Sequence, residues 1–434
     1  MLSRSKLLLS QKLALAQVLT NTTIRGVATT ATQGKIGGDI SSVFPSLSGI
    51  APPPLPDRYA ELKRRFTVGR ERVLAESWER LLLDLEKETA VVKRFGSDII
   101  PQVEFKNLSS LDTAKIAEIK KRGVVVVKNV LPDNEALAMK ESLKGYIKRN
   151  SWAKAFPADS PAVYELYWSP AQRAARAHPS LIASQRFVNS LWHSSLPASM
   201  VDTSVSLPYA DRFRIRQPGD AGFALGAHID GGSVERWEDG EYSRCYQKIW
   251  TGEWEEYDAY DADHRVHAKM DMYDGAGSCG VWRSWQGWLS LSTTSPHEGT
   301  LLVNPLLKHA TAYTILRPFF NLSTPTTTLS TTPHFPNSFQ GASQEYNNTT
   351  HPHLRLDETM THVPRIAPGD YVFWHCDTIH AVDRVHRGAS DSSVLYIPAV
   401  PWTVQNEAYV ERQRDAEMRG VSPEDFPVGV GVEV

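Results

Sequence analysis

The chain is poor in cysteine, nearly neutral and free of long apolar runs. Its three cysteines are too few and too widely spaced for a disulfide framework or a cysteine-rich zinc site. No run of about eighteen apolar residues is present, so we expect no membrane span. The formal net charge of -2 at pH 7 argues against nucleic acid as a partner. What remains is a large globular protein, for which 434 residues with 41% hydrophobic content are ample.

The first 38 residues contain no acidic side chain. They carry an interrupted, amphipathic apolar stretch between Leu7 and Leu19, flanked by Ser, Thr and Gln. This composition is typical of a mitochondrial transit peptide, which we place at residues 1–30. The alternative is a disordered basic tail on a cytoplasmic protein. Residues 31–57 are rich in Gly, Ser and Pro and predict a linker.

Residues 58–434 are expected to form a single domain that begins with helices. Apolar residues between Leu74 and Leu85 recur at helical spacing and predict a helix within residues 58–94. A second helix over Ile116–Gly123 leads into four consecutive valines, Val124 to Val127, which are typical of a buried strand.

Strand patterns dominate the second half of the chain. Between them we expect a long irregular loop at 234–284 and a flexible insertion at 321–362, which contains a Thr-rich stretch. Many strands with regular turn signals predict a mainly β protein with flanking helices (α+β) and a double-stranded β-helix, or jelly-roll, core. The predicted strands are 212–216, 285–291, 299–305, 310–319, 371–374, 379–382 and 393–397.

The motif His228-Ile229-Asp230 lies in a segment that reads as a strand followed by a Gly-Gly turn. On a strand, residues i and i+2 point to the same face, so the imidazole and the carboxylate can converge on one point. One imidazole and one carboxylate are two of the three ligands in the 2-His-1-carboxylate triad that holds non-haem Fe(II). The motif therefore predicts a metal site if a second histidine completes it.

The order of motifs along the chain resembles the Fe(II)/2-oxoglutarate-dependent dioxygenase superfamily over roughly residues 100–405. His-x-Asp is followed, after a long interval, by Gly369-Asp370, a strand, a turn and a histidine in an apolar setting. Gly299-Thr-Leu-Leu-Val303 is similar to the superfamily's central strand. Within the superfamily the chain most resembles the YbiU-like uncharacterised branch, through Arg214–Gly219 and His228–Trp237.

The resemblance implies Fe(II) held by His228, Asp230 and His380, with 2-oxoglutarate and O2 as cosubstrates. It implies hydroxylation of a small-molecule substrate with release of succinate and CO2. His375 and His386 remain alternatives for the third ligand, and His375 could instead orient another ligand.

The resemblance also implies an arginine that binds the distal carboxylate of 2-oxoglutarate in a bidentate manner. In the superfamily this arginine follows the second histidine by about ten residues. Here that stretch reads Ser390-Asp391-Ser392-Ser393, so the chain departs from the pattern. The arginines that could serve instead are Arg384, Arg387, Arg214, Arg216 and Arg317.

Two other functions stay open at this stage. One is a cupin-like jelly-roll metalloenzyme that does not use 2-oxoglutarate, and the other is a non-catalytic jelly-roll binding protein. For an enzyme, residues 235–257 are expected to form a lid over the substrate. Trp282, Trp285 and Trp288 are candidates for the pocket wall, with burial in the core as the alternative.

Overall fold

The computed structural model describes residues 35, 38–196, 199–275, 278–322, 329–427 and 431–433. Contacts divide the chain into Met1–Gln33 and Gly34–Val434, and the described residues all belong to the second unit. The predicted transit peptide lies outside them, so the mitochondrial location stays a prediction. None of the described helices has the length and hydropathy that a membrane span requires.

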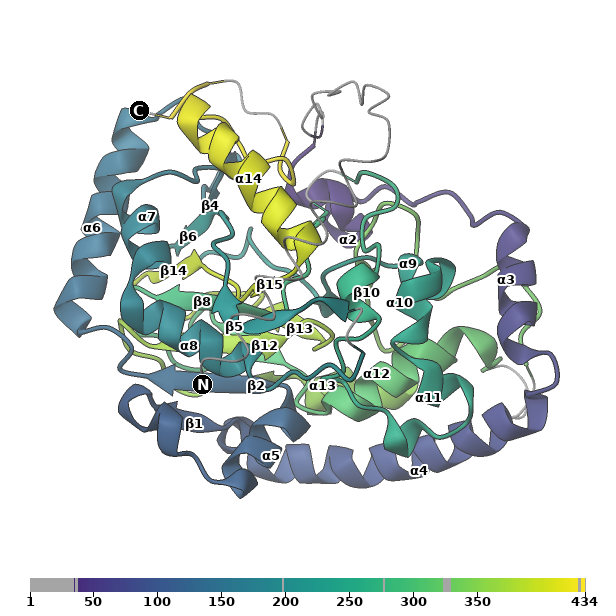
Figure 1. Ribbon diagram of the computed structural model, residues 1–434. Coiled ribbons are helices and arrows are strands. Elements are labelled where there is room, and N and C mark those ends of the chain that lie inside the picture. The colour runs from purple at the N-terminus through teal and green to yellow at the C-terminus, as the bar shows by residue number, and fades with distance from the viewer. Residues whose placement is uncertain are drawn as a thin grey trace, which may run out of the picture. The chain divides into compact units, whose positions relative to one another are not determined.

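The larger sheet in the described part of the chain has eight strands, in the order β1-β2-β12-β8-β14-β6-β4-β3 (Figure 1). Its two central strands are β8 and β14, which pair antiparallel, and the four-valine strand β2 lies between the edge strand β1 and β12. Its strands are β1 (Gln102–Glu104), β2 (Val124–Lys128), β3 (Ala155–Phe156), β4 (Val163–Tyr164), β6 (Phe213–Arg216), β8 (Trp285–Ser290), β12 (Tyr371–His375) and β14 (Ser392–Tyr396).

A second sheet has five strands, in the order β10-β7-β13-β9-β11, and all of its pairings are antiparallel. Its strands are β7 (His228–Ile229), β9 (Leu301–Val303), β10 (Gln344–Glu345), β11 (Thr361–His362) and β13 (His380–Val382). The short strands β5 (Asp202–Ser206) and β15 (Pro401–Trp402) pair separately.

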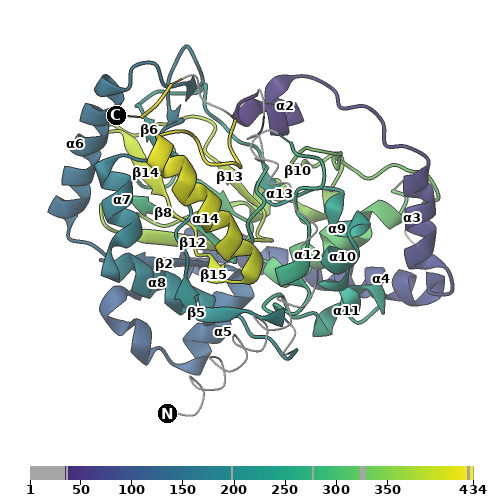
Figure 2. The same ribbon diagram turned by 45° about the horizontal axis from the view of Figure 1, so that its top comes forward.

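Helices pack around these sheets, so the fold is mixed α+β. The predicted helix within 58–94 is present as two helices, and the longer one, α4, runs beside α12 and α13 in both ribbon views (Figures 1 and 2). The helices are α2 (Pro45–Ser48), α3 (Arg58–Thr67), α4 (Glu71–Phe95), α5 (Thr113–Arg122), α6 (Asp133–Arg149), α7 (Pro170–Ala177), α8 (Pro179–Asn189), α9 (Glu235–Glu238), α10 (Gly240–Arg244), α11 (Gln247–Trp250), α12 (Leu307–Leu316), α13 (Leu356–Thr359) and α14 (Val404–Arg419).

The predicted strand at 310–319 is wrong, because this segment forms α12 and a following 3-10 turn, Arg317–Phe319. Most residues of α12 are buried on every side. A helix buried all round has no polar face, so its sequence lacks the 3.6-residue periodicity that would distinguish it from a strand.

The described residues of the predicted linker and of the predicted insertion make contacts with distant parts of the chain. In the described part of 321–362, β10 pairs with β7, and Phe335 and Leu354 are buried. In the predicted linker, the 3-10 turn Ile40–Val43 and helix α2 are formed, and Val43 accepts a backbone hydrogen bond from Ser343 at 2.8 Å. These described residues are therefore held by partners distant in sequence, which the composition of a segment does not indicate.

Gly369 directly precedes Asp370 and β12, and its backbone has φ +83°. A Cβ atom there would lie 2.2 Å from the Leu131 carbonyl oxygen. We expect Gly369→Ala to destabilise the fold by more than the roughly 1–3 kcal/mol of backbone strain alone, measured by chemical denaturation. Gly219→Ala is the matched control, because its φ is +79° and nothing lies within 4 Å. Equal losses for the two variants would contradict a steric role for the Leu131 contact.

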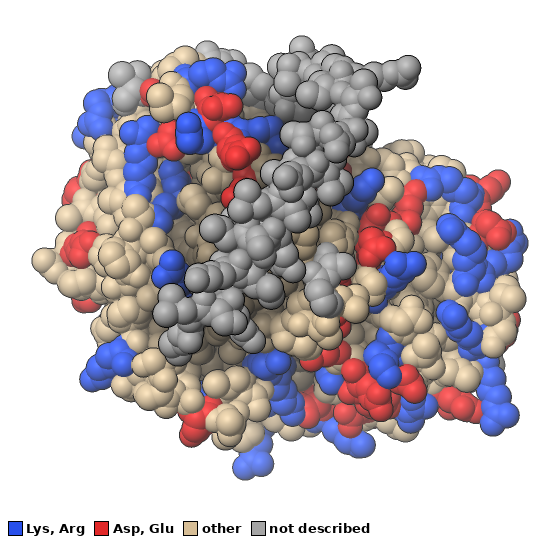
Figure 3. Space-filling model, viewed as in Figure 1, with Lys and Arg blue, Asp and Glu red and all other residues tan. Residues whose placement is uncertain are grey.

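The surface carries charges of both signs. On the face in Figure 3, Lys and Arg side chains are interspersed with Asp and Glu side chains over the described residues. This distribution agrees with the formal net charge of -2.

Candidate functional site

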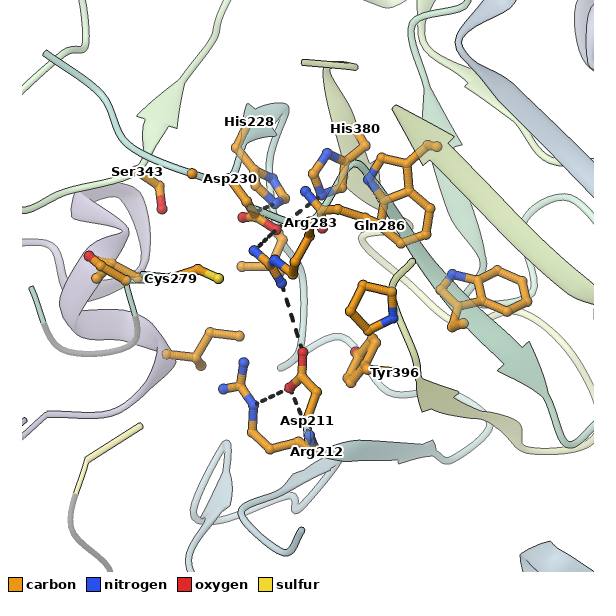
Figure 4. Close-up of a pocket in the computed structure, with 18 of the residues that line it drawn as sticks. Asp211, Arg212, His228, Asp230, Cys279, Arg283, Gln286, Ser343, His380 and Tyr396 are labelled. Carbon is orange, nitrogen blue, oxygen red and sulfur yellow. Dashed lines mark hydrogen bonds and ion pairs between the residues drawn. The ribbon is translucent and has the colours of Figure 1, made fainter. Parts of the chain in front are cut away.

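His228, Asp230 and His380 come together where β7 and β13 pair, with His380 directly opposite His228 in the antiparallel register. The candidate ligand atoms of the three residues all lie within 4.8 Å of one another. His228 Nε2 is 3.5 Å from Asp230 Oδ1, and His380 Nε2 is 3.8 Å from Asp230 Oδ2 (Figure 4). The cross-strand pair supplies both imidazoles, and the residue after β7 supplies the carboxylate.

Backbone carbonyls orient both imidazole rings. His228 Nδ1 lies 2.7 Å from the Gly226 carbonyl oxygen, and His380 Nδ1 lies 3.1 Å from that of Thr378. A carbonyl can only accept, so in neutral rings each Nδ1 carries the proton and each Nε2 presents a lone pair to Asp230. This is the tautomer that a metal ligand needs, fixed by hydrogen bonds from outside the site.

The charge states of the site also suit a cation. Burial opposes ionisation of Asp230, but the nearby His228, His380 and Arg283 outweigh it and bring the pKa of Asp230 to about 2. Burial, reinforced by His228, lowers the pKa of His380 to about 3. At neutral pH the site therefore holds an ionised carboxylate and a neutral His380 ring, which are the forms that bind metal.

The three residues open into a cavity of about 130 Å³. It lies between the two sheets, because strands of both contribute to its wall, and the Ile40–Phe44 segment covers part of it. Phe44 packs edge-on against His228, with ring centroids 4.9 Å apart. Wall residues from the eight-stranded sheet are Arg214, Gln286, Gly287, Trp288, Trp374 and Tyr396, and those from the five-stranded sheet are His228, Leu301, His380 and Val382.

Of the arginines considered from the sequence, Arg214 is the one that lines this cavity among the described residues. Arg384 and Arg387 are exposed and lie outside its wall. Arg317 is buried elsewhere, where it donates to the carbonyls of Thr350 and Phe320.

Arg216 does not line the cavity either, and its guanidinium has partners elsewhere. It is ion-paired with Asp220 at 2.5 Å and donates to the Asp383 carbonyl at 2.6 Å. It is therefore held by internal partners.

His375 lies apart from the site. Its Nε2 lies 2.9 Å from the Ala259 carbonyl, its Nδ1 accepts from the Asp377 amide, and its ring stacks on Trp192. With both ring nitrogens satisfied and the ring fully buried, His375 has a packing role. His386 is not grouped with His228 and Asp230 either, and its Nδ1 accepts from the Gly388 amide.

A second group of metal-ligand types, His297, His362 and Asp383, lies outside the cavity wall. There, His362 Nε2 is hydrogen-bonded to Asp383 Oδ1 at 2.7 Å. Substitutions in this group provide a control for metal-binding experiments on His228, Asp230 and His380.

Residues 235–257 do not form a lid in the described structure. They fold into α9, α10, α11 and a 3-10 turn, and none of them lines the cavity. Their large aromatic side chains, including Trp237, Tyr246 and Trp250, are buried in the core. Of the three tryptophans proposed for the pocket wall, Trp288 lines the cavity, whereas Trp282 and Trp285 are core residues.

Sequence reasoning missed Arg283, Asp211 and the Ile40–Phe44 segment, which all contribute to the cavity wall. Arg283 stands two residues before β8, outside any motif. In the sequence, Arg283 is recognisable only as a charged residue shortly before an apolar strand, and that pattern is common at strand ends.

A family model described as Gig2-like matches residues 53–433. The chain belongs to the Gig2-like family. It is 33% identical to the uncharacterized protein YbiU of Escherichia coli K12 over 354 residues, covering 78% of this chain and 82% of that protein. The predicted YbiU-like relationship is therefore confirmed.

Two solved structures of similar proteins share the fold. One is GlcNAc Inducible Gene 2 (GIG2) of Candida albicans, with TM-score 0.80, 33% identity and coverage of 87% of this chain and 83% of that one. The other, from Salmonella typhimurium LT2, is named "Putative Oxidoreductase" and matches with TM-score 0.75, 29% identity and coverage of 92% and 93%. The same architecture thus recurs in fungal and bacterial proteins.

Proposed function

We propose that this Gig2-like protein is an Fe(II)- and 2-oxoglutarate-dependent oxygenase that hydroxylates a small molecule and releases succinate and CO2. The observation that carries the proposal is the convergence of two imidazole Nε2 atoms and one carboxylate at the wall of a cavity between two sheets. The oxidoreductase name of the Salmonella relative is consistent with it.

The residues present fit an iron ion. The set of His228, Asp230 and His380 is the facial triad of non-haem iron enzymes, and Asp230 retains 26% side-chain exposure toward the cavity. When bound, Fe(II) would supply the one-electron and O2 chemistry that side chains lack. The protein itself holds the two rings in one tautomer and keeps Asp230 ionised.

The proposal includes the jelly-roll core. It is supported by the mostly antiparallel pairing of the eight-stranded sheet, the antiparallel pairing of the five-stranded sheet and the position of the cavity between them. In such a double-sheet core, ligands reach the interior between the sheets.

Arg214 is the proposed ligand for the distal carboxylate of 2-oxoglutarate. In the described structure it has no carboxylate partner within ion-pair distance, its side chain is buried, and its Nε has no hydrogen-bond partner. Its Nη2 contacts Ser392 Oγ at 3.2 Å. Ser392 lies in the stretch where the oxygenase superfamily carries its arginine, so a guanidinium from the paired strand β6 reaches that place. Burial lowers the pKa of Arg214, as expected for a cation without a full countercharge.

Arg214→Gln tests this assignment. We expect 2-oxoglutarate to bind 10- to 100-fold more weakly, since hydrogen bonds to charged groups contribute roughly 1.5–3 kcal/mol. The dissociation constant is measured anaerobically with Fe(II). Arg384→Gln, at an exposed position, should change it by less than about twofold. An unchanged affinity in Arg214→Gln would refute the assignment.

The decisive experiment for the function is an anaerobic titration of the full chain with Fe(II) and 2-oxoglutarate. We expect a weak visible charge-transfer band, followed by succinate release when O2 is admitted. Iron binding without the band would favour a cupin-like metalloenzyme that does not use 2-oxoglutarate. No iron binding at all would favour a binding protein without catalysis.

A further inference from the structure

Arg283 places a guanidinium in the cavity beside the proposed metal ligands. Its Nη2 lies 3.9 Å from Asp230 Oδ2, and its Nη1 lies 3.9 Å from Asp211 Oδ2 (Figure 4). Both distances exceed hydrogen-bond length. Among the described residues, no hydrogen bond fixes the Arg283 guanidinium. The group is charged, faces the cavity and retains free donors.

Two other buried arginines of this chain, Arg265 and Arg216, are paired with a carboxylate much more closely. Arg265 contacts Asp377 at 2.5 Å, and Arg216 contacts Asp220 at 2.5 Å. The Arg283 side chain is only 14% exposed yet lacks such a partner. Leaving a nearly buried cation without a close anion costs free energy, unless a ligand supplies the anion.

Near Arg283, the arginine cations are not fully balanced by carboxylates at ion-pair distance. Asp211 is shared, because Arg212 Nε also contacts it, at 3.3 Å. Asp230 is the carboxylate that the proposed function assigns to the metal. Once that charge is engaged, Asp211 is the one carboxylate of the described residues that remains within 4 Å of Arg212 or Arg283.

Arg283 is also held in position. Its guanidinium lies 5.6 Å from the ring centroid of Tyr209, a cation-π distance. The Tyr209 hydroxyl donates to Asp425 Oδ2 at 2.8 Å, which anchors the ring. A guanidinium that is fixed in place binds an anion with a smaller loss of side-chain entropy.

We infer that the substrate carries an anionic group, a carboxylate or a phosphate, and that Arg283 binds it next to the metal site. The inference rests on the proposed function, which assigns Arg214 to 2-oxoglutarate and leaves Arg283 for the second anion. Arg283 is then a specificity-determining residue that selects acids over neutral molecules of the same shape. Because Arg283 lies beside Asp230, an anion bound to it would hold the substrate close to the proposed metal site.

The test uses the full chain loaded anaerobically with Fe(II) and 2-oxoglutarate. The probes are phenylacetate, its neutral isostere phenylacetamide, and phenyl phosphate, and binding is followed by tryptophan fluorescence, because Trp288 and Trp374 line the cavity. We expect at least one acid to bind tenfold or more tightly than the amide. Arg283→Gln should abolish this preference and Arg283→Lys should keep part of it. Preference for phenylacetate or for phenyl phosphate distinguishes a carboxylate from a phosphate substrate.

Three results would overturn the inference: no preference for either acid in the wild type, an undiminished preference in Arg283→Gln, or a tenfold loss of 2-oxoglutarate affinity in Arg283→Gln with none in Arg214→Gln. The last result would mean that Arg283 binds the cosubstrate. Failure of the proposed function looks different, since the wild type would then give no visible band with Fe(II) and 2-oxoglutarate. Repeating the probe titrations without iron and 2-oxoglutarate keeps the anion preference measurable in that case.

Discussion

Asp230→Ala is expected to abolish stoichiometric Fe(II) binding, with at least a hundredfold loss of affinity, and to eliminate succinate release. The carboxylate is the one anionic ligand of the proposed triad, and its oxygens lie within 3.8 Å of both imidazole Nε2 atoms. Without it, two imidazole rings and the Arg283 cation would face the metal. His228→Ala and His380→Ala should act in the same direction. Bound iron is measured per chain after anaerobic loading and desalting.

Two histidines serve as controls for this experiment. His375→Ala should keep iron, because both nitrogens of that ring are committed to internal hydrogen bonds. His362→Ala should also keep iron, because His362 belongs to the second group, with Asp383. If His380→Ala retains iron while His375→Ala or His362→Ala loses it, the metal site has been placed wrongly.

Asp377→Ala is expected to lower the free energy of unfolding by about 3–5 kcal/mol, the cost of leaving a buried charge unpaired. Arg265 contacts both carboxylate oxygens of Asp377, at 2.5 and 3.3 Å, and each side chain is 2% exposed. Asp377 lies between β12 and β13, so the pair also positions the chain that leads into His380. Urea denaturation measures the loss, provided that the dependence of the unfolding free energy on urea concentration is the same in the wild type and the variant.

Glu76→Ala provides the surface comparison. The Arg72–Glu76 pair is an exposed i,i+4 contact at 2.7 Å, and its loss should leave the free energy of unfolding almost unchanged, because solvent screens both charges. The double variant Arg265→Met/Asp377→Leu should recover much of the lost stability, because apolar replacement removes both charges. A loss below about 1 kcal/mol in Asp377→Ala would show that another group compensates Arg265.

Local patterns were sufficient where neighbouring residues decide the conformation. The four valines of β2 are fully buried within the larger sheet, as their run of apolar residues predicts. Leu74 and Trp78 mark the buried face of α4 through helical spacing. The His-x-Asp spacing placed His228 and Asp230 on one side of a strand end, and the structure brings them together.

Local sequence patterns did not predict the structure correctly where contacts with distant residues determine the conformation. α12 is buried all round and therefore carries no amphipathic period. β10 gains its conformation by pairing with β7, more than a hundred residues earlier in the chain. Arg384 and Arg387 stood close to His380 in sequence, yet they are exposed, whereas Arg214 reaches the cavity from another strand.

The sequence alone determined the residue types of the site, most of the strands around it and the relationship to the YbiU-like proteins. The residue types and the strands follow from spacing and periodicity, which are properties of short stretches of chain. The relationship follows from the resemblance of the Arg214–Gly219 and His228–Trp237 segments. Only the tertiary structure decided that His380 rather than His375 faces Asp230, and that Arg214 and Arg283 line the cavity. The register between β7 and β13 and the partners of each buried charge are set by long-range contacts, and these have no counterpart in local sequence.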